Sequence, residues 1–151
     1  MYSWASTNNM AFNSDKFELI RYGKDTTLQQ NNYTADNDIK EKESLKDLGV
    51  WMSNDCTFSE HIESITKTAK QMSGWILRTF MSRNSDHLLP LWKSLVVSKM
   101  EYVCQLWCPH KIKDIQKLEQ VQRVFTRKVT DKSLSYWDRL KDLGLYSLQR
   151  R

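Results

Sequence analysis

A chain of 151 residues with 40% hydrophobic and 27% charged side chains, four glycines and two prolines can bury one globular core. It lacks both an apolar run of about 18 residues and the basic-then-apolar start of a signal peptide, which argues against a membrane span and against secretion. We therefore expect an intracellular protein, nuclear or cytoplasmic, with no membrane partner. The net charge of +5 is uneven, because residues 59–130 carry 12 basic and 6 acidic side chains, whereas residues 1–58 carry 6 and 9.

Residues 1–56 are predicted to form short, mixed elements. Tyr2–Asn9 has the composition of a helix end, and the aromatic and β-branched run Phe17–Tyr22 favours a strand that stops at Gly23. Polar residues indicate a loop over Asp25–Asn32. Further short strands are predicted at Tyr33–Ala35, Ile39–Lys42 and Leu48–Met52.

Residues 57–151 have the periodicity of helices. Thr57 and Glu60 have the spacing of a capping box at the start of the first helix. Apolar residues then recur every three or four positions, at Ile62, Ile65, Ala69, Met72, Ile76 and Phe80. A second, densely apolar helix is predicted to begin at the cap Ser85, to bend near Pro90 and to end before Pro109.

Two more helices follow in the same region. The third has the apolar stripe Ile112, Ile115, Leu118, Val121, Phe125 and Val129, and its polar side is basic. The fourth begins at the cap Ser135 and ends at Gly144, which favours a left-handed stop. The predicted fold class is therefore α+β, mainly α, with a small β-hairpin region at 1–56 and a helical domain of three to four helices at 57–151.

Five sequence blocks resemble the reverse transcriptases of non-LTR retrotransposons of the jockey and chicken-repeat type. The blocks are Asn8-Asn9-Met10 with Lys16-Phe17-Glu18 and Arg21-Tyr22-Gly23-Lys24; Lys46-Asp47-Leu48-Gly49-Val50 with Thr57-Phe58-Ser59-Glu60-His61-Ile62; Lys93-Ser94-Leu95-Val96 with Glu101-Tyr102 and Trp107; Leu118-Glu119 with Val121-Gln122-Arg123 and Phe125-Thr126; and Leu134-Ser135-Tyr136 with Leu143-Gly144-Leu145. Their order and spacing are similar to the end of the palm, the primer grip and the thumb of such enzymes.

The resemblance implies roles for two parts of residues 1–56. Lys16 matches a palm lysine that acts as a general acid toward the leaving pyrophosphate, although from its position alone it is an ordinary surface lysine. Leu48, Gly49 and Val50 match the primer grip, whose backbone approaches the 3′ end of the primer. The alternative for these three residues is an ordinary turn or bulge.

The resemblance also implies that the helical region holds an RNA or RNA/DNA template-primer duplex through its phosphates. The candidate contacts are Lys67, Lys70, Arg78, Arg123, Arg127 and Lys128, and their alternative is a solvated helical surface. Trp75, Trp92 and Trp107 lie among apolar helical positions, which favours core packing over base stacking. His61, in the first turn of the first helix, is interpreted as structural.

The departures from the family concern the chemistry. The chain contains no Asp-Asp pair, whereas reverse transcriptases hold their metal ions with an aromatic-Ala-Asp-Asp motif. We expect a fragment that begins after the catalytic centre and is inactive alone, with no cofactor, since Mg²⁺ serves only the intact polymerase. Cys56, Cys104 and Cys108 lack the paired spacing of a zinc site, so no metal site is predicted.

Two alternatives to a polymerase fragment remain open at this stage. The first is a binding module whose helices retain affinity for RNA or a hybrid duplex without the chemistry. The second is a protein-interaction domain whose apolar faces are completed by a partner or by self-association.

Overall fold

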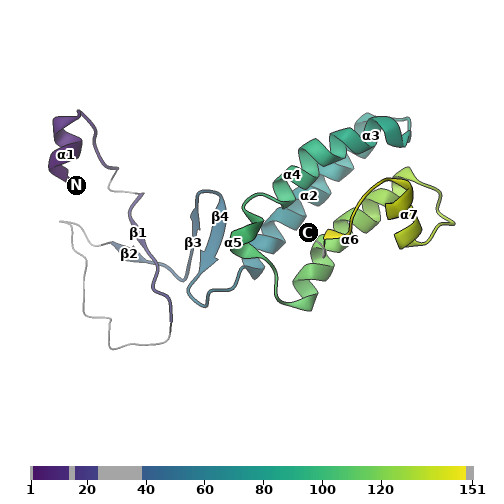
Figure 1. The fold of residues 1–151 in the computed structure, drawn as a ribbon. Coiled ribbons are helices and arrows are strands. Elements are labelled where there is room, and N and C mark those ends of the chain that lie inside the picture. Colours follow the sequence, from purple (N-terminus) through teal and green to yellow (C-terminus); the bar gives the residue numbers. More distant parts are fainter. Residues whose placement is uncertain (1, 14–15, 24–38, 149–151) are drawn as a thin grey trace. The chain divides into compact units, whose positions relative to one another are not determined.

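The computed structural model describes residues 2–13, 16–23 and 39–148, which divide into two compact units, Met1–Thr57 and Phe58–Arg151 (Figure 1). Helices dominate the described part of the chain, and its strands are short and belong to the first unit. The predicted α+β, mainly α fold class is therefore confirmed. Among the described residues, no helix combines the length and the apolar content that crossing a bilayer requires.

The first unit contains one short helix and two small sheets. Helix α1 spans Tyr2–Thr7, as the sequence predicted. Strand β1 (Glu18–Leu19) pairs in parallel with β2 (Lys40–Glu41), and β3 (Ser44–Asp47) pairs antiparallel with β4 (Val50–Ser53). The predicted strands at Phe17–Tyr22 and Ile39–Lys42 are thus present as two-residue pieces.

The β3–β4 hairpin turns at Leu48 and Gly49, so the predicted strand Leu48–Met52 is wrong at its start. Both residues have positive φ, 45° at Leu48 and 91° at Gly49, and Asp47 pairs with Val50 across the turn. Two consecutive left-handed residues give the two-residue turn whose twist matches that of the flanking strands. The predicted loop Asp25–Asn32 and the predicted strand Tyr33–Ala35 lie outside the described residues.

The second unit begins with helix α2 (Ser59–Thr79), which lacks the predicted capping box. Asp55 Oδ1 accepts from the Thr57 N–H at 3.0 Å and from the Thr57 hydroxyl at 2.9 Å, and the helix begins one residue later than the capping box requires. The residue at the cap position, Phe58, makes no side-chain hydrogen bond to the helix. The apolar face is as predicted, because Ile62, Ala69 and Ile76 are buried.

The next helical stretch is interrupted where the sequence predicted a bend. It consists of α3 (Ser85–Trp92), the π-helical turn η3 (Lys93–Val97) and α4 (Ser98–Met100), followed by α5 (Cys104–Trp107). The cap is Asn84, whose Oδ1 accepts from the Asp86 N–H at 2.8 Å, and not the predicted Ser85. Val103, at a left-handed φ of 52°, separates α4 from α5, so the regular helix ends before Pro109.

Helices α6 (Ile112–Val129) and α7 (Tyr136–Asp142) complete the second unit. The predicted cap of α7 is confirmed, because the Ser135 hydroxyl accepts from the Asp138 N–H, and Gly144 has the predicted left-handed φ of 59°. The apolar stripe of α6 starts later than predicted, since Ile112 is 72% exposed.

The core of the second unit is centred on one aromatic pair. The rings of Trp92 and Phe125 stack at 4.8 Å with an interplanar angle of 13°, and both side chains are fully buried. The Trp92 indole N–H donates to the Ser73 hydroxyl at 3.2 Å, so one side chain joins α3, α6 and α2. Aromatic pairs of this kind add stabilisation beyond that of the area they bury.

We expect Phe125→Ala to lower the free energy of unfolding by about 3–5 kcal/mol, because it leaves a cavity beneath the Trp92 ring. Urea denaturation followed by circular dichroism measures the change. Val124→Ala, at a half-exposed position on the same helix, is the control and should stay within about 0.5 kcal/mol. Equal losses for the two variants would contradict a core centred on this pair.

Candidate nucleic-acid interface

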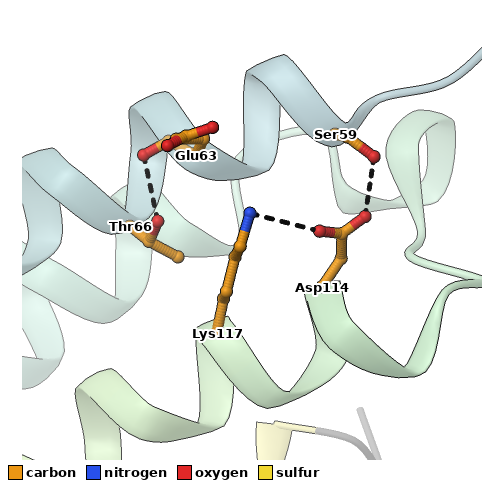
Figure 2. Close-up of polar contacts among 5 residues, drawn as sticks. All are labelled: Ser59, Glu63, Thr66, Asp114 and Lys117. Atoms are coloured by element: carbon orange, nitrogen blue, oxygen red, sulfur yellow. Dashed lines mark hydrogen bonds and ion pairs between the residues drawn. The ribbon is translucent and has the colours of Figure 1, made fainter.

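Helices α2 and α6 are held side by side at their N-terminal ends by a buried carboxylate (Figure 2). The Ser59 hydroxyl donates to Asp114 Oδ2 at 2.8 Å, and the Lys117 ammonium lies 3.6 Å from Asp114 Oδ1. Asp114 is 2% exposed, so these contacts compensate a charge removed from water. Because Ser59 opens α2 and Asp114 lies in the first turn of α6, the two helices start at the same end.

Lys117 connects this anchor to the outer surface of α6. Figure 2 shows its side chain directed toward the face of α2 that carries Glu63 and Thr66. The residues that share its side of α6 follow at intervals of three and four: Lys113, Lys117, Gln120, Val124 and Lys128. This stripe contains three lysines and no acidic residue.

Helix α2 carries a stripe with the same spacing, which consists of Glu63, Lys67, Lys70, Gly74 and Arg78. Lys70 follows Thr66 by one turn, on the side toward which Lys117 points. Since the helices start at the same end and pack against each other, the two stripes run in the same direction on neighbouring helices. We call this surface the α2–α6 basic face and define its cations as Lys67, Lys70, Arg78, Lys113, Lys117 and Lys128.

The six basic residues predicted to contact phosphates are all exposed, but they are not all on this face. Lys67, Lys70, Arg78 and Lys128 belong to it. Arg127 precedes Lys128 and lies toward the neighbouring strip of α6, which carries Arg123 four residues earlier. The guanidinium of Arg123 is 4.5 Å from the centre of the Tyr136 ring, a cation–π contact with α7.

Lys113 and Lys117 were missed as interface candidates. Their spacing, four residues apart and in phase with Lys128, was the available signal in the sequence. The partner of Lys117 could not be recognised in the same way, since Asp114 is 55 residues from Ser59. Only the packing of α6 against α2 brings the carboxylate, the hydroxyl and the ammonium together.

Arg123 borders a polar network that fastens the segment after α7 to α6. The Tyr136 hydroxyl donates to one Glu119 carboxylate oxygen, and the other accepts from the Leu148 N–H at 2.9 Å. Gln122 Nε2 donates to the Tyr146 carbonyl at 2.9 Å. Burial of the phenol, together with its bond to the Glu119 carboxylate, raises the pKa of Tyr136 above its ordinary value.

The three tryptophans of the helical region divide into two kinds. Trp92 and Trp107 are buried, which confirms their assignment to the core, and the Trp107 ring meets the buried His61 ring edge-on at 5.2 Å. Trp75 is 50% exposed, so its assignment to core packing is wrong. Trp75 lines an apolar groove together with Leu95 of η3.

The predicted site residues of the first unit are in contrasting environments. Leu48 is 85% exposed at the tip of the hairpin and Gly49 is exposed beside it, whereas Val50 is 2% exposed. Lys16 is exposed, and its backbone N–H donates to the Asn13 carbonyl at 3.1 Å. Among the described residues, no three His, Cys, Asp or Glu side chains gather as a metal ion would require.

The described residues form a small α+β protein whose helical unit carries exposed basic residues on α2 and α6. The chain is 26% identical over 132 residues to a probable RNA-directed DNA polymerase from the X-element transposon of Drosophila melanogaster. It is 25% identical over 111 residues to an uncharacterized protein of Caenorhabditis elegans. These matches cover 82% and 71% of the chain but 14% of the fly protein and 56% of the worm protein. No family model and no solved structure matches the chain.

We expect Asp114→Ala to destabilise the chain by about 1–3 kcal/mol, because the Ser59 hydroxyl loses its acceptor and Lys117 loses its counter-charge. Urea denaturation measures the loss. Asp142→Ala removes an exposed carboxylate at the end of α7 and is the control, with a change expected within about 0.5 kcal/mol. Indistinguishable midpoints for the two variants would rule out the anchor.

The raised pKa of Tyr136 predicts a loss of stability in alkaline solution. In the unfolded chain the Tyr136 phenol ionises near pH 10, whereas in the folded chain it stays protonated at that pH. The contribution of Tyr136 to the free energy of unfolding is therefore complete below about pH 10 and is lost as the pH rises beyond it. The stability difference between the unsubstituted chain and Tyr136→Phe should therefore shrink above that pH. Unfolding both proteins with guanidinium chloride at several pH values, from neutral to alkaline, measures this difference. A difference that stays constant with pH would contradict the prediction.

Proposed function

We propose that this chain is the palm-end, primer-grip and thumb portion of a non-LTR retrotransposon reverse transcriptase of the jockey and chicken-repeat type. The similarity to the fly transposon polymerase over 82% of the chain supports an origin in such an enzyme. In this proposal residues 1–56 contribute the end of the palm and the primer grip, and residues 57–151 contribute the thumb. The template-primer duplex, of RNA or of RNA and DNA, is the partner of the parent enzyme.

The observation that carries the proposal is the α2–α6 basic face. Six cations and one carboxylate, that of Glu63, project from two helices fixed by a buried anchor. Phosphates are spaced regularly along both strands of a duplex, so paired rows of ammonium and guanidinium groups can neutralise several at once. Such contacts orient a duplex without selecting its sequence, as a polymerase thumb requires.

The primer grip and the general acid belong to the same proposal. Leu48 and Gly49 project at the tip of a hairpin whose left-handed turn leaves their backbone exposed, which suits an approach to the sugar-phosphate chain. Lys16 is exposed and lies outside the strands, so its ammonium can reach a pyrophosphate in the intact polymerase. Mg²⁺ would be held by aspartates that this sequence does not contain.

We expect the triple variant Lys70→Glu, Lys117→Gln and Lys128→Glu to weaken binding of an RNA/DNA hybrid. It should also flatten the salt dependence of binding by roughly one unit for each phosphate that the variant no longer neutralises. Lys117 is neutralised and not reversed, because a carboxylate there would face Asp114. Fluorescence anisotropy over a range of salt concentrations measures both effects. The control reverses the exposed Lys93 and Lys132 and neutralises Lys141, which alters the net charge equally.

Binding by the unsubstituted chain at low salt is the first requirement of this experiment. If no hybrid binds there, the proposed duplex contact fails. Equal weakening by the interface variant and by its control would show attraction by net charge alone, and would remove the basic face from the proposal.

We also expect no primer extension by the purified chain with primed RNA, deoxynucleotides and magnesium, since no Asp-Asp pair is available to hold the two metal ions. A gel assay of labelled primer measures extension. Activity that survives in Lys16→Ala but disappears with further purification would be a contaminant. Activity that follows the chain through purification would contradict the proposal.

A further inference from the structure

An apolar groove lies on the side of α2 away from α6. Its walls are Thr68, Gln71, Met72 and Trp75 of α2 and Leu95 of η3, and its volume is about 490 Å³. Trp75 is 50% exposed. An accessible aromatic face beside a thioether and a leucine is a suitable surface for another flat, apolar group.

The charged residues of α2 that lie one helical turn from the groove lining are both basic. Arg78 follows Trp75 by three residues, and Lys67 precedes Gln71 by four, so both cations share a stretch of helix surface with the groove. Lys99, also exposed, follows Leu95 by four residues on the opposite wall. Residues 64–85 contain no Asp or Glu, so this part of α2 offers no competing carboxylate.

Lys67 and Arg78 belong both to the border of this groove and to the α2–α6 basic face. Lys67 and Arg78 can therefore meet the phosphates of a nucleic-acid strand that passes from the basic face to Trp75. The lining of the groove is almost wholly apolar, and the Thr68 hydroxyl already donates to the Ser64 carbonyl at 3.0 Å. Gln71 of the same lining carries an amide, which can donate to and accept from the edge of a base. An apolar groove with a half-exposed indole and with cations one helical turn from its lining matches the chemistry of a nucleotide.

We propose that this groove binds an unpaired nucleotide, with its base stacked on Trp75 and the adjoining phosphates on Lys67 and Arg78. Other proteins bind single-stranded nucleic acid with this combination of aromatic faces and cations, without selecting its sequence. The inference rests on the proposed function in taking nucleic acid as the partner. It adds a site for a single-stranded segment next to the duplex.

The test measures binding of the full chain to labelled oligouridylate by fluorescence anisotropy at low salt. We expect Trp75→Ala to weaken binding about ten-fold, the size of one lost base stack, and Trp75→Phe to weaken it less because a ring remains. Trp137→Ala removes a 61% exposed indole from α7 and is the matched control, with unchanged affinity expected. Circular dichroism checks that each variant keeps its helices.

A second measurement compares a blunt RNA/DNA hybrid with the same hybrid carrying a single-stranded uridine extension. The extension should increase the affinity of the unsubstituted chain, and Trp75→Ala should remove that increase while leaving blunt binding intact. If the blunt hybrid fails to bind but oligouridylate binds through Trp75, the proposed duplex function fails and the nucleotide site stands.

Three outcomes would overturn the nucleotide site. The first is equal affinity of Trp75→Ala and the unsubstituted chain for oligouridylate, and the second is equal loss in Trp75→Ala and Trp137→Ala. The third is quenching of tryptophan fluorescence by an acidic amphipathic helical peptide but not by oligouridylate, when this quenching is absent in Trp75→Ala. That result would assign the groove to a protein partner. Blunt binding that persists in each case would leave the proposed duplex function in place.

Discussion

The second unit depends on the fixed alignment of α2 with α6. A buried carboxylate is costly unless it is hydrogen-bonded and paired, and Asp114 obtains both from Ser59 and Lys117. Further along the two helices, Phe125 of α6 stacks on Trp92 of α3, whose indole N–H donates to Ser73 of α2. Without that alignment, the two rows of cations would have no fixed relation to each other.

The same side chains serve stability and binding to different degrees. Lys117 is held near Asp114, so it is already partly neutralised and contributes less free charge to a ligand than Lys70 or Lys128 does. Arg123 lies over the Tyr136 ring, and its exposed guanidinium helps to hold α7 against α6. The basic side chains of this surface therefore differ in how much free charge they offer to a ligand. The cations without such packing roles are the stronger candidates for phosphate contact.

Local patterns in the sequence predicted much of this fold. The spacing of apolar residues by three and four positions indicated α2 and α6. Ser135 indicated the start of α7 and Gly144 its end. These signals succeeded because each depends on residues that are close in the chain. The predicted capping role of Thr57 is wrong because α2 begins at Ser59, which puts Phe58 and not Thr57 at the cap position. The exposure of Trp75 and the anchoring of Lys117 escaped prediction because they depend on which faces of separate helices meet, and apolar character alone does not specify that.

The π-helical turn η3 has a consequence for the length of its helix. A turn closed by bonds five residues apart holds one residue more than an α-helical turn. Here the Ser98 N–H donates to the Lys93 carbonyl, and the neighbours Val96 and Val97 are both buried. The extra residue is thus absorbed locally, and the helix regains its phase with Met100 again on the core side. Relatives one residue shorter at this place could form a plain α-helix and keep the same core.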